Sequence, residues 1–269
     1  MSKILNWEEF LFPYQQAVNE LVLKFQSIID EYKLRGLYSP IESVKGRVKK
    51  SYSILEKAER KNIPDDMIEE LIEDIAGVRI LCQFVDDIEK IVEIIKSRDG
   101  IDLRVIEEKD YITNTKPSGY RSYHMIIAYT LMTSRGYREI LAEIQIRTLA
   151  MNFWATAEHS LKYKYNRKLP EELQERLVRS AEAAFWLDKE MNTIREDIMQ
   201  AQRINERRDR LTLSIIENLK KIYASDKVTD IGNIDNEYMK AMEGGDVFKM
   251  ENFNRELEAL LEKIEADEK

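Results

Sequence analysis

The spacing of apolar residues changes twice along this chain, from the helical period of 3.6 to the strand period of 2 and back again. Near the start, apolar side chains recur every three or four residues over 11–32, until Gly36 and Pro40 end the pattern. A second stripe begins after Pro170 and covers 173–198. Such stripes are typical of amphipathic helices. With 9 glycines and 5 prolines in 269 residues, turns are few, and long helices are predicted at both ends.

The segments between these stripes alternate as strands do. Alternation or a short apolar run predicts strands over 77–84, 103–106, 124–132 and 138–148, and 88–96 fits a helix between the first two. In the last strand one face is entirely apolar, and the other carries a row of polar side chains. We therefore predict an α/β (α+β) fold with a mixed sheet of about five strands, flanked by long N- and C-terminal helices.

Charge divides the chain into two parts. Residues 206–269 hold 11 basic and 16 acidic residues, a net charge of −5 out of −8 for the whole chain. We predict helices over 206–223 and 251–264, joined by a polar segment. The predicted organisation is a main domain over 1–205 and an acidic helical extension over 206–269.

Composition excludes several classes of site and location. Cys82 is the single cysteine and there are 2 histidines, which excludes an internal disulfide and makes a thiolate or histidine metal cluster improbable. A hard cation held by carboxylates stays open. No apolar run reaches the length of a bilayer span, and Met1–Phe12 has no basic region followed by an apolar stretch. We expect a cytoplasmic protein without a membrane partner.

A basic segment stands out against the negative total. Residues 45–61 carry seven basic and two acidic residues, a net charge of +5 in a chain of −8. Arg47, Lys49 and Lys57 are spaced so that they can converge on the phosphates of a nucleotide. The alternative is an ordinary solvated helix face.

Two carboxylates are candidates for a magnesium site. Asp74 precedes the strand that begins near Gly77, and Glu143 lies on the polar face of the strand over 138–148. If these strands are neighbours, the two carboxylates can meet and hold Mg²⁺, which prefers oxygen ligands. The alternatives are a helix-end residue for Asp74 and a surface ion pair for Glu143.

A polar loop over 110–124 leads into a buried strand and is a third candidate. Tyr120 offers a ring for stacking on a base, while Lys116, Arg121 and His124 can contact phosphate. Loops on rigid scaffolds often carry binding groups. The alternative is a structural turn built by proline, serine and glycine.

These motifs together resemble a known enzyme family. Four segments, in this order, resemble the synthetase domain of RelA/SpoT-type enzymes: GRVKKSYSILEKAER (46–60), EDIAGVRILCQFVDD (73–87), DYITNTKPSGYRSYH (110–124) and EIQIRTLAMNFWATAEHSLKYKY (143–165). The chain is most similar to the small, single-domain alarmone synthetases, which are GTP pyrophosphokinases. The resemblance covers roughly residues 10–205 and implies a nucleotidyltransferase-like fold with a synthetase domain over 1–205.

The resemblance also implies an activity. It is transfer of pyrophosphate from ATP to the 3′-hydroxyl of GTP or GDP, which releases AMP and makes (p)ppGpp in the stringent response. It implies a Mg²⁺ cofactor and a homotetramer, to which the apolar stripes could contribute. We expect no hydrolase activity, because the paired histidines of the usual hydrolase pattern are missing.

Residue roles follow from the resemblance position by position. Asp74 and Glu143 are the implied catalytic and metal-binding residues. ATP binding is implied for Arg47, Lys49, Lys57, Arg60 and Arg79. Binding of GTP or GDP is implied for Lys116, Tyr120, Arg121, His124, Gln145 and Asn152.

Other functions stay open from the sequence. Residues 162–168 interleave basic and aromatic side chains as sites for single-stranded RNA do, which would suit an RNA-binding regulator. A different nucleotidyltransferase could use similar carboxylates. A coiled-coil role is a third possibility, although the polar row beside Glu143 argues against it.

Overall fold

The computed structural model describes residues 6–134, 136–165, 169–225 and 231–266. The chain forms two compact units, Met1–Asn192 and Thr193–Lys269. The division falls earlier than the predicted domain boundary at 205. Among the described residues, no helix is long and apolar enough to cross a membrane.

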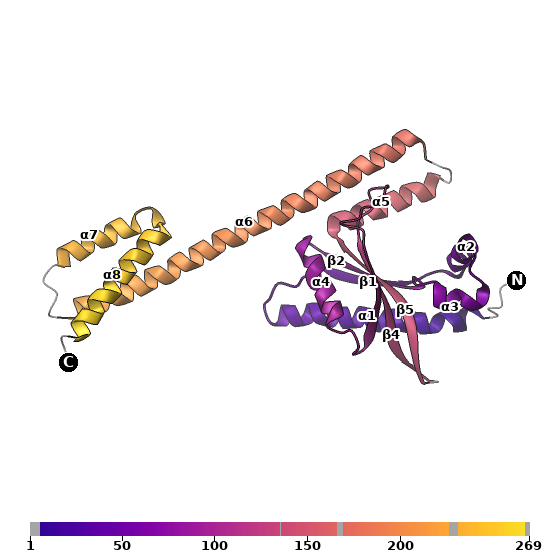
Figure 1. Cartoon of the computed structure of the whole chain (residues 1–269), viewed down its shortest axis with the longest axis horizontal. Helices are drawn as coiled ribbons and strands as arrows, with labels where there is room; N and C mark the ends of the chain where they lie inside the picture. Colours follow the sequence, from indigo (N-terminus) through magenta and orange to yellow (C-terminus); the bar gives the residue numbers. More distant parts are fainter. Residues whose placement is uncertain (1–5, 135, 166–168, 226–230, 267–269) are drawn as a thin grey trace. The chain divides into compact units, whose positions relative to one another are not determined.

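The first unit is built on a mixed five-stranded sheet, which confirms the predicted fold class (Figure 1). Its strands are β1 (Ser43–Val48), β2 (Ala76–Cys82), β3 (Leu103–Asp110), β4 (Tyr123–Thr133) and β5 (Gly136–Thr148). The strand order is β1-β2-β5-β4-β3. β2 and β5 run parallel, and the other neighbours are antiparallel. The parallel pair brings together two strands that are far apart in the sequence.

Both units contain helices, and one of these helices contributes residues to each unit. They are α1 (Trp7–Leu34), α2 (Ser51–Lys61), η1 (Asp65–Met67), α3 (Ile68–Leu71), α4 (Asp86–Lys96), α5 (Leu149–Tyr165), α6 (Glu171–Tyr223), α7 (Ile231–Met242), η2 (Glu243–Gly245) and α8 (Val247–Ala266). The apolar stripe over 173–198 and the helix predicted over 206–223 are parts of one helix, α6, because no proline or glycine interrupts the sequence between them.

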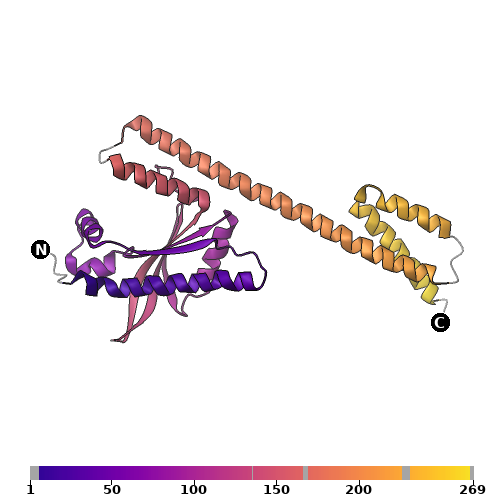
Figure 2. The same cartoon turned by 180° about the vertical axis from the view of Figure 1, so that it is seen from behind.

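α1 lies along one face of the sheet, as both views show (Figures 1 and 2). Asn6 caps it by accepting hydrogen bonds from the backbone of Glu8 and Glu9. Its predicted apolar stripe is buried and packs with the strands into one core. A Cβ at Gly46 of β1 would lie 2.3 Å from Val18 Cγ1, so the close approach of α1 to β1 requires glycine there.

The strand β1 was not predicted from the sequence. It forms the start of the basic segment, where only Val44 and Val48 are apolar. As an edge strand it pairs with β2 alone, so it needs no continuous apolar face and leaves no clear alternation.

The second unit has an apolar core of its own. Its buried side chains come from the end of α6, α7 and α8: Ile215, Leu219, Ile222, Ile234, Ala241, Met250, Phe253 and Leu257. A buried hydrogen bond of 3.1 Å joins Asn218 Nδ2 to Asn254 Oδ1 within this core. α7 was predicted only as a polar segment, and its burial against its neighbours explains why it is helical.

Candidate active site

One face of the sheet carries a row of polar side chains across all five strands. Cross-strand partners share a face, and the register pairs in turn Lys45, Arg79, Gln145, His124 and Lys109. The adjacent side chains along β5, Ile144 and Ile146, point to the opposite face and are buried in the core. The polar row therefore lies on the face opposite α1.

Asp74 lies beside this row, in the turn between α3 and β2. The parallel pairing of β2 with β5 places Gly77 opposite Glu143, which confirms that the strand after Asp74 and the strand of Glu143 are neighbours. Asp74 forms ion pairs with Lys49 Nζ (2.7 Å) and Lys57 Nζ (2.8 Å). Burial acts to raise the pKa of Asp74, but its hydrogen bonds to the two lysines outweigh burial and lower it.

Glu143 is held from two sides. Its Oε1 lies 2.9 Å from His124 Nδ1, and its Oε2 accepts a 2.6 Å hydrogen bond from Gln145 Nε2. Burial and the nearby charge of Asp74 raise the pKa of this carboxyl. The hydrogen bonds from His124 and Gln145 act in the opposite direction and outweigh both effects, so that the net pKa lies below the ordinary value. Glu143 is therefore ionised at neutral pH.

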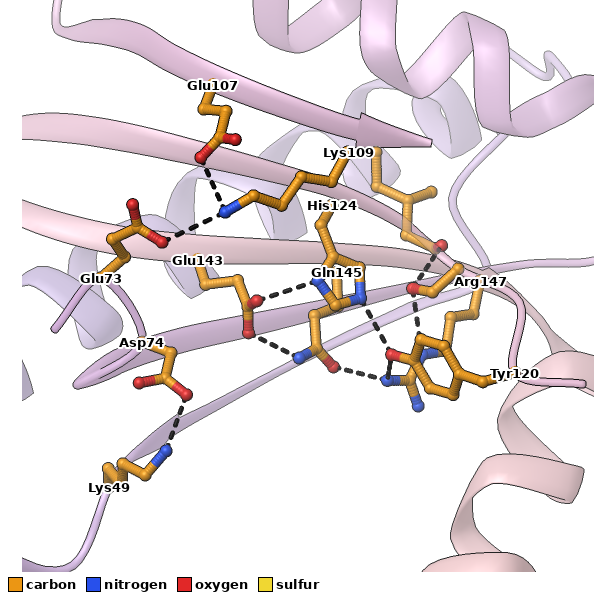
Figure 3. Close-up of polar contacts among 12 residues, drawn as sticks. Lys49, Glu73, Asp74, Glu107, Lys109, Tyr120, His124, Glu143, Gln145 and Arg147 are labelled. Carbon is orange, nitrogen blue, oxygen red and sulfur yellow. Dashed lines mark hydrogen bonds and ion pairs between the residues drawn. The ribbon is translucent and has the colours of Figure 1, made fainter. Parts of the chain in front are cut away.

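These contacts belong to a closed ring of side chains, which Figure 3 shows. Tyr120 Oη lies 2.9 Å from His124 Nε2 and accepts a 2.5 Å hydrogen bond from Arg147 Nη2. Arg147 Nη2 also donates to Gln145 Oε1 at 2.8 Å. The sequence reasoning did not single out Arg147. The available signal was the alternation of β5, which puts Arg147 on the same face as Glu143 and Gln145.

Lys109 was also missed, and no sequence motif indicated it. Its Nζ lies 3.2 Å from Glu73 and 2.7 Å from Glu107 (Figure 3). Burial lowers its pKa, but the hydrogen bonds to the two carboxylates outweigh burial and raise it. The loop before β2 is thereby joined to β3 beside the polar row.

In the loop over 110–124, the ammonium group of a lysine packs against two tyrosine rings. Lys116 Nζ lies 4.0 Å from the centre of the Tyr111 ring and 4.9 Å from that of Tyr120. Burial lowers the pKa of Lys116, and the charges of Arg147 and Lys109 lower it further against the opposite effect of Glu143. The ammonium group of Lys116 and the two tyrosine rings thus lie next to the cycle of hydrogen bonds that includes Glu143.

α6 supports this loop from behind. Gly119 has φ +82, and a Cβ there would lie 2.6 Å from Ala181 Cβ, so only glycine fits. Arg121, predicted as a phosphate contact, instead donates to Ala181 O at 3.3 Å and lies 4.5 Å from the Phe185 ring centre. Asn152 on α5 has a buried Oδ1 with no hydrogen-bond partner among the described residues.

A basic cavity opens at the other side of the row. It has a volume of about 150 Å³ and is lined by Lys45, Gly46, Arg47, Gly77, Val78, Arg79 and Gln145. The buried Nε of Arg79 has no hydrogen-bond partner among the described residues. Burial, and then the charges of Arg147 and Arg47, lower the pKa of Arg79. Converging arginines without a carboxylate in the lining suit an anion.

Two further predicted features, Arg60 and the run over 162–168, are not among the described residues that line this cavity. Arg60 is exposed in the last turn of α2. In the run over 162–168, which suggested an RNA-binding alternative, residues 166–168 lie outside the described part of the chain, as do the side chains of 163–165.

The oxygen donors fit a weakly coordinated hard cation. The described residues contain no group of three or more histidine, cysteine, aspartate or glutamate side chains that could hold a metal. Asp74, in the turn before β2, and Glu143, on the adjacent strand β5, are two carboxylates whose charges influence each other. Mg²⁺ is often bound by one or two carboxylates together with substrate phosphates, so this pair meets that requirement.

Comparison with known proteins gives consistent matches. A family model described as the region found in RelA/SpoT proteins matches residues 46–168. GTP pyrophosphokinase YjbM of Bacillus subtilis (strain 168) is 54% identical over 196 residues, which are 73% of this chain and 92% of that protein. GTP pyrophosphokinase YwaC of the same organism is 42% identical over 195 residues, 72% of this chain and 92% of that protein.

Solved structures agree in fold and sequence. Small alarmone synthetase 1 from Bacillus subtilis bound to its product pppGpp superimposes with a TM-score of 0.68 and 53% identity, covering 71% of this chain and 97% of that one. The same synthetase bound to AMPCPP gives a TM-score of 0.64 and 49% identity, covering 72% of this chain and 98% of that one.

Proposed function

This chain belongs to the RelA/SpoT family of GTP pyrophosphokinases, and we propose that it synthesises (p)ppGpp by moving pyrophosphate from ATP to the 3′-hydroxyl of GTP or GDP, with release of AMP. The observation that carries the proposal is the placement of Asp74, in the turn before β2, near Glu143 on the neighbouring strand β5. A basic cavity lies on one side of them, and a loop with Lys116 packed against two tyrosine rings on the other. One polar face thus offers a place for each nucleotide.

Glu143 is the proposed catalytic carboxylate. Attack by a ribose hydroxyl on phosphorus requires a group that orients the hydroxyl and takes its proton. The lowered pKa keeps Glu143 ionised, and two hydrogen bonds fix its direction. Such preorganisation favours the charge distribution of the transition state.

Asp74 and Glu143 are the proposed holders of a divalent metal ion, Mg²⁺ by resemblance. When bound, the ion neutralises charge on the phosphates as the transferred group moves. In the structure Lys49 and Lys57 pair with Asp74. These two ion pairs are proposed to keep the Asp74 carboxylate aligned for the metal ion. The ammonium groups of the two lysines are also proposed to contact phosphate oxygens of the bound nucleotide.

ATP is proposed to bind on the basic side of the row. Arg47 and Arg79 line the cavity, and the partnerless Nε of Arg79 has a donor to offer a phosphate oxygen. Lys49 and Lys57 complete this side, and Arg60 contributes from the exposed end of α2. Guanidinium and ammonium groups supply the positive charge that two nucleotides require beyond one metal ion.

The acceptor nucleotide is proposed to bind at the 110–124 loop. Tyr120 offers its ring to the guanine base, and Lys116 and His124 lie beside it for the phosphates and ribose. Gln145, which Arg147 joins to Tyr120, and Asn152 on α5, which has an acceptor left open, are also proposed to contact this nucleotide. Arg121 is proposed to act on this nucleotide by holding the loop on α6.

We also propose a homo-oligomer, a tetramer by resemblance. A groove of about 830 Å³ between α5 and the first part of α6 is lined mainly by apolar side chains. Phe153 is 75% exposed there and Leu187 56%. Exposed apolar surface of this extent favours association. Light scattering of the parent and of Phe153→Glu tests it, and a parent that is monomeric at all concentrations contradicts it.

The activity is tested by its stoichiometry. Purified protein is incubated with ATP, Mg²⁺ and either GTP or GDP, and nucleotides are separated by ion-exchange chromatography. We expect AMP and a guanosine 3′-diphosphate product in equal amounts. Formation of free pyrophosphate with a nucleotidylated product would instead indicate a different nucleotidyltransferase.

A further inference from the structure

Two separate series of side-chain hydrogen bonds connect Arg147 to Glu143, and we call each series an arm. One runs through Tyr120 and His124, and the other through Gln145 alone. Arg147 is 5% exposed, and its side chain also donates to Ser122 Oγ through Nε at 3.2 Å. A buried guanidinium with this many directed contacts is closely fixed.

In both arms, the donor and acceptor chemistry of each group requires every hydrogen bond to be donated in the direction from Arg147 toward Glu143. Arginine only donates, and a carboxylate only accepts. Tyr120 accepts from Arg147, so its single proton is available for His124 Nε2, and His124 then donates from Nδ1 to Glu143. Gln145 accepts at Oε1 from Arg147 and donates from Nε2 to Glu143. Every hydrogen bond in the ring is therefore compatible with every other.

We propose that Arg147 is a positioning residue that orients the Glu143 carboxylate through both arms and couples it to Tyr120, the proposed contact of the guanine base. This inference rests on the proposed function. Arg147 reaches Glu143 only through other side chains, so it sets the direction of the carboxylate without touching the reacting atoms. If binding of the guanine base moves Tyr120, it also moves a side chain of the hydrogen-bonded cycle that holds Glu143.

The backbone around Arg147 supports this role. The carbonyl of Arg147 accepts from Cys82 Sγ at 3.3 Å, and the next residue, Thr148, donates to the buried Asp188 at 2.6 Å. Arg147 is thus anchored on both sides at the end of β5. A lysine has one ammonium in place of the planar fork, so it cannot serve both arms and Ser122 with the same geometry.

The kinetic test compares Arg147→Met, Arg147→Lys and Tyr120→Phe, and the double variant of Arg147→Met with Tyr120→Phe. We expect Arg147→Met to lower kcat about 10- to 100-fold, the range for loss of a supporting contact, with KM for ATP within about twofold of the parent. Arg147→Lys should recover only part of this. The double variant should lose less than the product of the two single losses, because both changes break the same arm.

A second test needs no nucleotide. The chain has 2 histidines, His124 in the ring and His159 exposed on α5, so imidazole ¹⁵N NMR resolves the ring from an internal reference. In the parent protein, His124 should carry its proton on Nδ1. Tyr120→Phe and Arg147→Met should each shift the Nε2 resonance of His124 and leave those of His159 unchanged.

The results separate this inference from the proposed function. Unchanged His124 resonances in both variants, strictly multiplicative kinetic losses, or full recovery by Arg147→Lys would overturn the role of Arg147 while synthesis of (p)ppGpp stands. If Arg147→Met does not fold, Tyr120→Phe still tests the arm through His124. Absence of synthesis in the parent protein refutes the function, whereas the NMR result bears on the ring alone.

Discussion

Glu143 on β5 and His124 on β4 are joined by a 2.9 Å contact between Oε1 and Nδ1, although the backbone register pairs His124 with Gln145. The imidazole therefore reaches diagonally across the antiparallel pair to the carboxylate. This diagonal leaves Gln145 free to approach Glu143 from its own strand. The carboxylate is fixed from two strands at once, which is the geometry that an orienting base requires.

Lys57→Ala should weaken the use of ATP. Lys57 Nζ lies 2.8 Å from Asp74, on the side where we place the ATP phosphates. We expect KM for ATP to rise about tenfold, the effect of one charge-assisted contact, with a small change in KM for the guanosine nucleotide. Lys61→Ala, in the exposed last turn of the same helix, is the matched control. Equal effects of the two variants on KM for ATP would refute the placement.

Gly119→Ala should displace the guanosine loop. The new Cβ would lie 2.6 Å from Ala181 Cβ, in a backbone with φ +82. We expect KM for the guanosine nucleotide to rise at least about tenfold, with KM for ATP nearly unchanged. Gly100→Ala has a similar φ of +76 but nothing within 4 Å, so it measures backbone strain alone. A similar kinetic effect of both variants would show that contact with α6 is unimportant.

Asp188→Asn should stabilise the protein at neutral pH but not in acid. Burial raises the pKa of Asp188 to about 6 from 3.8, against the opposing effects of Thr148 and Arg121. The folded state thus binds this proton more tightly than the unfolded state, so the stabilisation by protonation is present below pH 3.8 and is lost as pH rises to about 6. Asparagine still accepts from Thr148 and never ionises.

Urea unfolding measures this difference at pH 4 and pH 8. The gain in the free energy of unfolding should be near zero at the lower pH and on the order of 1–2 kcal/mol at the higher, after allowance for solvent screening at the groove. The same gain at both pH values would show that ionisation of Asp188 does not limit stability.

Phe253→Ala should loosen the second unit without affecting synthesis. Phe253 is 4% exposed in the core that α8 shares with α7 and the end of α6. Truncation of such a side chain costs about 3–5 kcal/mol. We expect faster amide exchange within 193–266 and activity within about twofold of the parent. Phe248→Ala removes a ring that is 67% exposed on the same helix and should change neither. Loss of activity in Phe253→Ala alone would contradict separate cores.

The sequence predicted the central sheet because its inner strands are buried. The strict alternation around Glu143 in β5 and the apolar run of β4 left no other assignment, and both strands are observed. β1 was missed because an edge strand can be polar, as Arg47 and Lys45 are. α7 was missed although Ile234, Tyr238 and Ala241 recur at helical spacing, because the polar residues among them and the nearby glycines suggested a polar connecting segment.

The sequence singled out several residues that the structure places together, but not the network that joins them. Motif spacing singled out Glu143, His124 and Tyr120, yet a spacing cannot show that Arg147 closes a ring through them. Arg121 illustrates the opposite case. Its charge suggested a phosphate contact, whereas its guanidinium lies against Phe185, because the direction of a loop side chain depends on which helix packs behind it.

The most direct test of the central claim follows both transferred phosphorus atoms. ATP labelled at the β and γ positions is incubated with Mg²⁺, GTP and either the parent protein or Glu143→Gln, and the product is analysed by ³¹P NMR and chromatography. We predict that both labels move together to the 3′-oxygen of the guanosine nucleotide with one AMP released, and that Glu143→Gln lowers the rate at least about 100-fold. Transfer of a single labelled phosphate, or a parental rate in Glu143→Gln, would contradict pyrophosphoryl transfer with Glu143 as its catalytic carboxylate.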